Sequence, residues 1–431
     1  PLRPFTAFAW HPPGPRPHVK PLFWVGNGQP AWAAAQTSKH MEDGTRVMLT
    51  TALVGDLLRN PEDLCRGPDG RPGTEMGVWP AAGTAAVAAR VDAYFAAMAA
   101  AGGRVDHLAL DFEDGYSNWG MTEARLAAIG ADPRFPALAA RLGFADPTKA
   151  LLQRSGPGGE YLRWNAVTDR TVAAALNAAV TEPVRRHFPA AGVSNFGGAA
   201  MAPAHVLPDL NGHRQYTLGD PAGTHQAPAA YGEWAPANLP GDWSRPFMTV
   251  VYAANVARVG VLSGGQPVLP WVGFKSWTVD GPHRVTWGRT PYWEEGVVHT
   301  LLGGGADNLL FFNPADKLVR PPDDPTQGGA RPADNDALEA LMADLERQAG
   351  GHRVVAPLPA AAPVAWDASF VVSSARLADG STLSRVTFAE RAGHADLRVG
   401  DQTVRVQRPA GQVGAWVRVP AGLKGSAGEG K

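Results

Sequence analysis

Hydrophobic positions follow two different patterns along the chain. Up to about residue 350, short and nearly continuous apolar runs alternate with alanine-rich segments of helical period. Continuous apolar runs are typical of strands buried on both faces, and their alternation with helices is typical of a parallel sheet. The predicted strands are Phe5–Trp10, Thr45–Thr51, Val105–Glu113, Ala191–Phe196, Phe247–Tyr252, Pro267–Phe274 and Asn308–Phe312, and the predicted helices are Ala85–Ala101, Thr168–His187, Trp293–Leu302 and Asn335–Gln348.

This first pattern predicts an α/β protein with a (β/α) TIM-type barrel over residues 1–350. An open doubly wound sheet is the alternative, but no Gly-x-Gly-x-x-Gly or phosphate loop follows the first strand. After Val355 the apolar residues alternate with period two between turn signals such as Asp379-Gly380. That second pattern predicts a small antiparallel β-sandwich module over residues 356–424, as a separate accessory domain.

One long segment breaks the alternation of strands and helices. Residues 202–246 are rich in Pro, Gly, Asn and His and carry several aromatic side chains. Long irregular segments inside a compact domain are usually functional. We therefore expect this segment to be a loop that lies over the carboxyl ends of the strands, with Trp234 or Trp243 facing the cleft.

Composition and charge exclude several classes of function. The chain has 431 residues, a net charge of −1 and no long basic run, so nucleic acid is a poor candidate partner. No 18-residue apolar stretch is present, so no membrane span is predicted. Cys65 is the single cysteine and the histidines have no ligand-pair spacing, so neither a metal site nor a cofactor is predicted.

The candidate chemistry centres on two acids that close one predicted strand. Asp111 and Glu113 follow the apolar run 105–110 and are two residues apart, so on a strand they share one face. Active sites of β/α barrels collect at the carboxyl ends of the strands. Two carboxylates held together there tend to differ in protonation, which is what a general acid requires. A capping aspartate beside a surface ion pair is the alternative reading.

Tryptophan side chains indicate a carbohydrate partner. The chain has 14 tryptophans, many of them at predicted strand ends or in loops. An indole presents a flat apolar face with one hydrogen-bond donor, which suits stacking on the C–H face of a sugar ring. Core filling is the alternative for any single tryptophan. The residues assigned to substrate binding are Trp10, Tyr116, Trp119, Asn195, Trp234, Trp271, Lys275, Trp277 and Asn313.

Five segments, in order from about residue 4 to 315, resemble the animal and venom hyaluronidases. They are the opening strand 4–10, the Asp-x-Glu strand 108–113 with Trp119 after it, the proline-led segment 246–252, the segment 267–272 and the final helix and strand 295–312. The resemblance covers the predicted barrel and leaves out the β module. Two positions depart from that family. Its last strand carries a tryptophan where this chain has Phe311-Phe312-Asn313, and it has a tyrosine-rich segment where this chain has Ser194-Asn195-Phe196.

The resemblance implies a retaining, substrate-assisted glycosidase acting on a poly- or oligosaccharide that contains 2-acetamido sugars. It implies that Glu113 is the acid/base, that Asp111 stabilises the acetamido group and that Tyr252 hydrogen-bonds the same group. We also expect an extracytoplasmic protein, secreted or periplasmic, and, because the sequence starts at Pro1 and not at Met, we expect that a signal peptide has been removed. Two alternatives remain: a two-carboxylate glycosidase that uses Glu233 or Glu295, and a carbohydrate-binding barrel without turnover.

Overall fold

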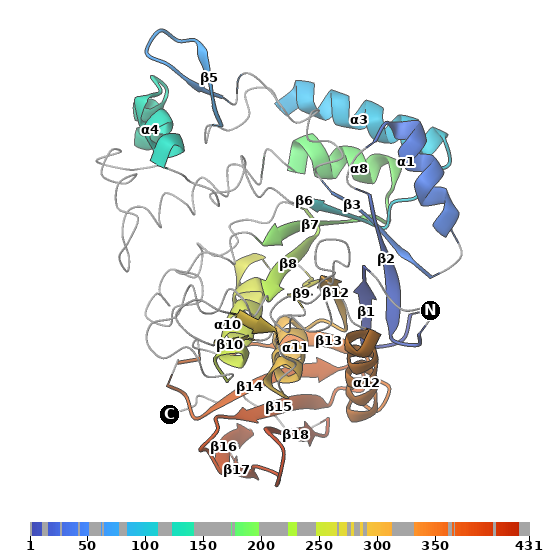
Figure 1. Cartoon of the computed structure of the whole chain (residues 1–431), viewed down its shortest axis with the longest axis vertical. Coiled ribbons are helices and arrows are strands. Elements are labelled where there is room, and N and C mark those ends of the chain that lie inside the picture. Colours follow the sequence, from blue (N-terminus) through green and yellow to red (C-terminus); the bar gives the residue numbers. More distant parts are fainter. Residues whose placement is uncertain are drawn as a thin grey trace.

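The computed structural model places most of the predicted elements (Figure 1). It describes residues 2–10, 16–25, 28–41, 44–50, 62, 64–76, 84–110, 123–141, 174, 177–197, 223–230, 247–264, 267–273, 277–279, 285–287, 291–312, 332–360, 364–365, 367–399 and 402–421.

Eight parallel strands form a closed ring in the order β1-β2-β3-β6-β7-β8-β9-β12. Every neighbouring pair is parallel, and β1 pairs with both β2 and β12, which closes the ring. The predicted parallel sheet is confirmed. The strands are β1 (Thr6–Ala9), β2 (Val19–Val25), β3 (Arg46–Thr50), β6 (His107–Leu110), β7 (Gly192–Gly197), β8 (His225–Ala230), β9 (Trp271–Gly273) and β12 (Asn308–Phe312).

Helices cover the outside of these strands. Among the described residues, no helix links β1 to β2 or β7 to β8, so the complete alternation of a TIM-type barrel belongs to the proposal below. The helical elements are α1 (Pro30–Thr37), the 3-10 turn Ser38–His40, α3 (Thr84–Ala100), α4 (Glu123–Ala131), α5 (Phe135–Arg141), the π-helical turn Asn177–Thr181, α8 (Glu182–His187), α10 (Phe247–Gly264), α11 (Pro291–Gly304) and α12 (Pro332–Gln348). Two small hairpins complete this part: β4 (Leu64–Arg66) with β5 (Pro72–Met76), and β10 (Trp277–Val279) with β11 (Val285–Trp287).

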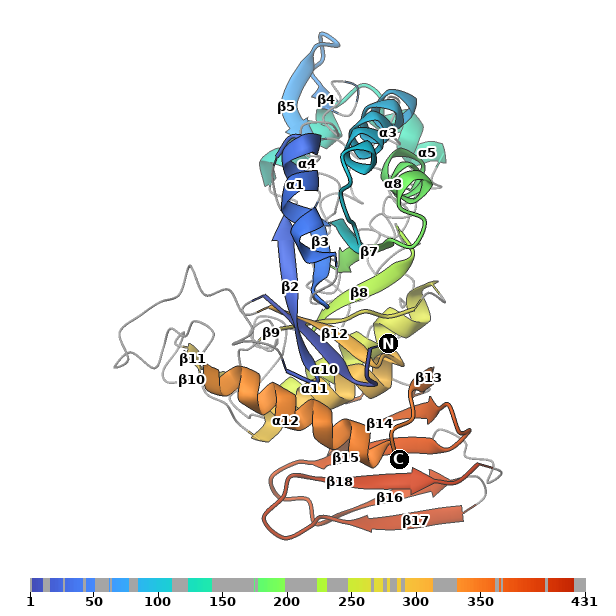
Figure 2. The same ribbon diagram turned by 90° about the vertical axis from the view of Figure 1, so that its right-hand side faces the viewer.

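The strands predicted after Val355 are present, are antiparallel and lie outside the ring. They form a four-stranded sheet in the order β13-β14-β15-β18 and a two-stranded hairpin, β16-β17. Helices α10, α11 and α12 lie between this sheet and the parallel strands, as Figures 1 and 2 show, and one buried cluster joins Leu301 and Leu338 to Leu383 across that boundary. The strands are β13 (Val354–Leu358), β14 (Phe370–Leu377), β15 (Thr382–Phe388), β16 (His394–Val399), β17 (Gln402–Gln407) and β18 (Gly414–Val419).

The prediction of a strand over Phe247–Tyr252 is wrong, because these residues begin helix α10. The cause is burial: residues 247–258 are all buried, against β8, α11 and the C-terminal sheet. A helix buried on every side shows no polar stripe, so its sequence cannot be distinguished from that of a buried strand.

Two barrel strands were absent from the prediction. β2 contains Pro21 and β8 contains Pro228, and proline removes a ladder donor, which argues against a central strand. β8 also lies inside the segment 202–246, so the prediction of a continuous irregular loop is wrong for His225–Ala230. Apart from Gly223 and Thr224, which directly precede β8, the rest of that segment lies outside the described residues. No helix that the structure describes is long and apolar enough to span a membrane.

Candidate active site

One buried cluster defines the interior of the barrel. Its residues come from seven different strands or their ends, so it can only lie inside the ring: Phe8, Leu22, Met48, Ala109, Ala227, Leu269, Trp271 and Leu310. On β6, His107 and Ala109 face this interior, while Leu108 belongs to the cluster that contains α3 and α8. The two predicted acids, Asp111 and Glu113, begin immediately after the last residue of β6 and lie outside the described residues.

Three tryptophans meet inside the barrel. Trp10 directly follows β1, and its ring centroid lies 4.9 Å from that of Trp24 on β2, edge to face. The centroid of Trp24 lies 5.8 Å from that of Trp271, which is fully buried at the start of β9. Trp10 and Trp24 are half-buried, so their rings form a partly accessible aromatic surface at the carboxyl ends of β1 and β2. We call these three residues the tryptophan cluster.

The tryptophan cluster contains two of the predicted substrate-binding residues, Trp10 and Trp271. Trp24 was missed because its strand was not predicted. Asn195 lies in β7 and pairs with Leu110, and Trp277 lies in β10 and pairs with Trp287. The other predicted residues lie outside the described part of the chain: Tyr116, Trp119, Trp234, Lys275 and Asn313, together with Glu233 of the alternative mechanism.

Tyr252 does not lie where its predicted role requires. The role assumed a strand, but Tyr252 is on helix α10 and is completely buried. Its neighbours in the buried cluster include Phe247, Tyr292 and Val371, the last of which belongs to the C-terminal sheet. This cluster lies on the outer side of the barrel, separate from the interior cluster, so we remove Tyr252 from the candidate site.

Glu295 is also excluded as a catalytic carboxylate. It lies on α11, is 5% exposed and faces the C-terminal sheet. Its carboxylate accepts hydrogen bonds from Arg385 Nε at 2.8 Å, from Arg385 Nη2 and from Thr387 Oγ1. These contacts connect α11 to the C-terminal sheet and leave no oxygen of Glu295 directed into the barrel. The alternative in which Glu295 is the second catalytic carboxylate is therefore wrong.

A polar cluster lies in the barrel interior near the amino-terminal ends of the strands. Arg46 stacks on Phe8, with 4.9 Å from the guanidinium carbon to the ring centroid, and its Nη2 lies 3.4 Å from His107 Nδ1. Because a guanidinium only donates, Nδ1 accepts, and the proton on Nε2 of His107 points at Ser194 Oγ, 2.7 Å away. His225 stands beside His107, and its Nδ1 lies 2.8 Å from Thr224 Oγ1.

Sequence reasoning missed this polar cluster, since two single histidines on separate strands, His107 on β6 and His225 on β8, carry no spacing signal. Gly192 leaves the space that the imidazole occupies: a Cβ there would lie 2.5 Å from His107 Nδ1. Burial is the main cause that lowers the pKa of His225 to about 4 and the pKa of His107 well below the ordinary value. Among the described residues, no group of three metal-ligating side chains is placed to hold a metal ion.

The buried histidines predict that the fold is acid-labile. Burial also lowers the pKa of His299, on α11, to about 3. As the pH falls below about 6.5, the unfolded chain takes up protons that the folded chain excludes, so the free energy of unfolding decreases between about pH 6.5 and pH 4. Each imidazole contributes up to about 1.4 kcal/mol per pH unit in that window, and above it the contribution is fully present.

Urea denaturation at pH 7.5, 5.5 and 4.5 tests this prediction. The midpoint should fall steadily toward acid, and His107→Gln should make that dependence shallower. A wild-type midpoint that is equal at pH 7.5 and pH 4.5 would show that these imidazoles do not stay neutral in the folded state.

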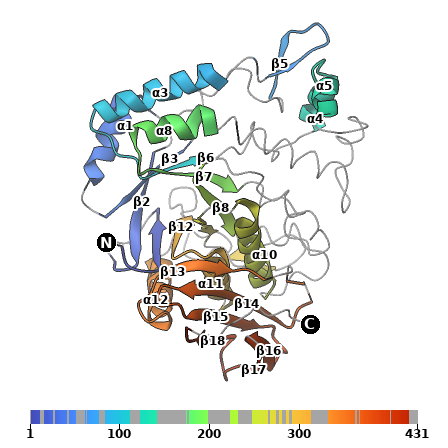
Figure 3. The ribbon, with the colours of Figure 1, turned by 180° about the vertical axis from the view of Figure 1, so that it is seen from behind.

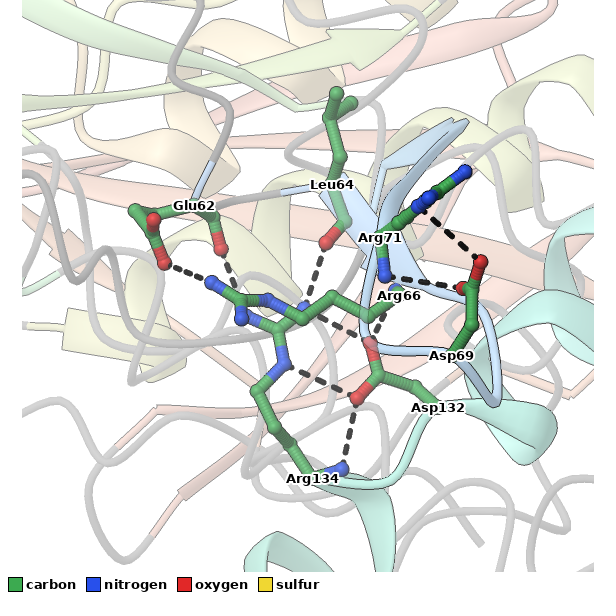
Figure 4. Close-up of polar contacts among 7 residues, drawn as sticks. All are labelled: Glu62, Leu64, Arg66, Asp69, Arg71, Asp132 and Arg134. Atoms are coloured by element: carbon green, nitrogen blue, oxygen red, sulfur yellow. Dashed lines mark hydrogen bonds and ion pairs between the residues drawn. The ribbon is translucent and has the colours of Figure 1, made fainter.

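Hydrogen bonds connect the segment between β3 and α3 to the segment that follows β6 (Figure 4). Asp132, between α4 and α5, has a side chain with no solvent exposure and accepts from the backbone N–H of Arg66 at 2.6 Å and from Arg134 Nη2 at 2.8 Å. Arg134 also donates to the carbonyl oxygens of Glu62 and Leu64. A buried, fully bonded carboxylate of this kind is structural. Asp132 thereby joins the hairpin β4-β5 to the end of α4. Figure 3 shows this hairpin and α4 side by side, beyond one end of α3.

Comparisons with known proteins add little. No family model and no curated protein sequence matches the chain. Among solved structures, it is similar to a cold-adapted β-galactosidase from Rahnella sp. at 13% identity and a TM-score of 0.40, over 78% of this chain and 53% of that one.

Two further solved structures are similar over more of their own length. Bee venom hyaluronidase has 12% identity and a TM-score of 0.29, over 75% of this chain and 96% of that one. A glycoside hydrolase family 30 subfamily 8 xylanase from Clostridium acetobutylicum has 11% identity and a TM-score of 0.33, over 97% and 94%. At TM-scores this low we draw no conclusion about fold or activity from the likeness.

Proposed function

We propose that the chain is a glycoside hydrolase built on a TIM-type β/α barrel. The observation that carries the proposal is the interior face of β6, on which His107 and Ala109 point into the ring. We expect the same alternation, continued two and four residues past Ala109, to turn Asp111 and Glu113 to that interior at the carboxyl end. Trp10 and Trp24 of the tryptophan cluster, which are half-buried at the ends of β1 and β2, supply apolar ring faces for a sugar in the same interior.

In the proposed reaction Glu113 protonates the glycosidic oxygen as the bond to the anomeric carbon breaks. The acetamido oxygen of the substrate attacks that carbon from the opposite face, and Asp111 stabilises the acetamido N–H. Glu113 then takes a proton from the water that opens the ring intermediate, so the anomeric configuration is retained. Substrate-assisted enzymes need no second catalytic carboxylate. This assignment of roles comes from the resemblance to hyaluronidases, without the contribution of Tyr252.

A panel of glycans tests the proposed function. It contains the hexasaccharides of chitin and of hyaluronan, chondroitin, xylan, and 4-nitrophenyl glycosides with and without a 2-acetamido group. We expect hydrolysis of at least one 2-acetamido member by the full chain. Hydrolysis of a glycan without that group would redirect the proposal to a two-carboxylate enzyme that uses Glu233. Binding without hydrolysis would leave a carbohydrate-binding barrel.

A further inference from the structure

Among the described residues, one of the exposed large apolar side chains is aromatic. Trp32 is in the first turn of α1 and is 50% exposed. A single exposed apolar residue is ordinary on a protein surface. Trp32 differs from an ordinary one in how its ring is held, and in where it lies relative to the tryptophan cluster.

The backbone beneath the ring is shaped to receive it. Gly28 has φ +142°, which side chains rarely adopt, and a Cβ at Gly28 would lie 2.1 Å from Cε3 and 2.6 Å from Cζ3 of Trp32. The indole therefore packs directly over the glycine backbone, and only glycine leaves room for it. This contact covers part of the ring, and half of the side chain remains open to solvent.

A side chain of helix α3 holds the backbone of Gly28 in place. The hydroxyl of Tyr94, on α3, donates to the carbonyl oxygen of Gly28 at 2.9 Å, and Tyr94 packs edge to face against Phe95 with 5.3 Å between the ring centroids. Pro30 begins α1 and fixes the entry of the helix. The backbone under Trp32 is therefore fixed before a ligand binds. A ligand that stacks on the open face of the indole restricts few additional rotatable bonds of the protein.

Trp32 lies close to the carboxyl end of β2. That strand ends at Val25, and three Cα–Cα steps of about 3.8 Å bring Gly28 within about 11 Å of it. Trp24, the preceding residue of the strand, belongs to the tryptophan cluster. A sugar chain that enters the barrel beside Trp24 and leaves over β2 would pass the open face of Trp32.

We propose that Trp32, packed over Gly28, forms an outer sugar-binding subsite. Its indole stacks on a pyranose ring of an oligosaccharide whose reacting end lies in the barrel. The inference rests on the proposed function and extends it to substrates of several sugars. The subsite discriminates by chain length, because a monosaccharide glycoside held in the barrel does not reach it.

The test compares long and short substrates. The panel hexasaccharide that the wild-type chain cleaves is measured beside the 4-nitrophenyl glycoside of its 2-acetamido sugar. For Trp32→Ala we expect KM for the hexasaccharide to rise on the order of tenfold, with kcat little changed and the aryl glycoside unaffected. Trp32→Phe should restore most of the affinity. Met41, which is 57% exposed, supplies the matched control Met41→Ala, expected to behave as the wild type.

The outcomes separate this inference from the proposed function. If the wild type cleaves the hexasaccharide and Trp32→Ala has the same KM, the subsite is refuted and the hydrolase stands. If the wild type cleaves no glycan, binding of the same hexasaccharides is followed by tryptophan fluorescence. Binding that Trp32→Ala weakens then supports the subsite alone, and binding that is absent or unchanged in Trp32→Ala refutes it.

Discussion

Replacing Glu113 by glutamine should lower the rate of hydrolysis of an aryl glycoside with a poor leaving group by about 100-fold or more. Glutamine keeps the size of the side chain and removes the proton that the leaving oxygen needs, and general acid catalysis contributes about 10²–10⁴-fold. The loss should be much smaller for a dinitrophenyl glycoside, whose leaving group departs without a proton. Steady-state kinetics with both substrates measures the difference.

Two further variants define the role of the strand end. Asp111→Asn should also impair turnover, because the proposed role of its carboxylate is to stabilise the acetamido group. Substrate binding should largely survive in both variants. Asp114→Asn, next along the chain, is the matched control and should retain turnover. Wild-type cleavage of the poor leaving group by Glu113→Gln would mean that Glu113 is not the acid and that the site assignment is wrong.

Replacing Arg385 by methionine should destabilise the whole chain by about 3–5 kcal/mol. The substitution leaves the carboxylate of Glu295 buried without its cation, and such losses have that magnitude. Arg385 also stacks on Trp416, with 4.8 Å from the guanidinium carbon to the ring centroid, so packing is lost as well. Urea denaturation of the full chain measures the change in the free energy of unfolding.

The control for Arg385→Met is Arg405→Met, which breaks the exposed ion pair with Asp396 and should change stability little. The double variant Glu295→Gln with Arg385→Met should recover part of the loss, since no unpaired charge remains. Equal stability of Arg385→Met and Arg405→Met would show that the buried pair does not hold the C-terminal sheet on α11.

These contacts bear on the predicted domain boundary. The division into residues 1–350 and 356–424 remains a proposal, but the two parts share more than a linker. His299, on α11, lies 2.9 Å from Ser373 Oγ and 2.8 Å from Thr387 Oγ1. Asn255 and Val364 exchange two hydrogen bonds, and Arg258 Nε donates to the carbonyl oxygen of Ala360. We therefore expect the C-terminal sheets to be required for the stability of the barrel.

Several elements could be predicted from the sequence because the pattern alone determined them. The helix at Thr84–Ala100 has a strong alanine-rich signal and ends at Gly102, which has a positive φ. The C-terminal strands alternate with period two because one face of their sheet is buried. The aromatic character of the barrel interior was also visible, through Trp10 and Trp271.

Other features depend on contacts that a sequence pattern does not encode. Helix α10 is buried on all sides, so it reads as a strand, and this misplaced Tyr252. β2 and β8 contain prolines, which the closed barrel tolerates. Because β2 was not predicted, the contacts of the Trp24 indole with Trp10 and Trp271 could not be expected. Glu295 has a partner 90 residues away, and the cluster of Arg46, His107 and Ser194 is assembled from three strands.

In the proposed mechanism a 2-acetamido sugar takes part in its own hydrolysis inside this barrel. The most direct measurement is the rate of hydrolysis of a 4-nitrophenyl 2-acetamido glycoside, its trifluoroacetamido analogue and the matching glycoside without the amide. Participation predicts that the acetamido compound is cleaved fastest, that fluorination slows the reaction by weakening the attacking oxygen, and that the compound without the amide is not cleaved. Equal rates for all three compounds would contradict the account.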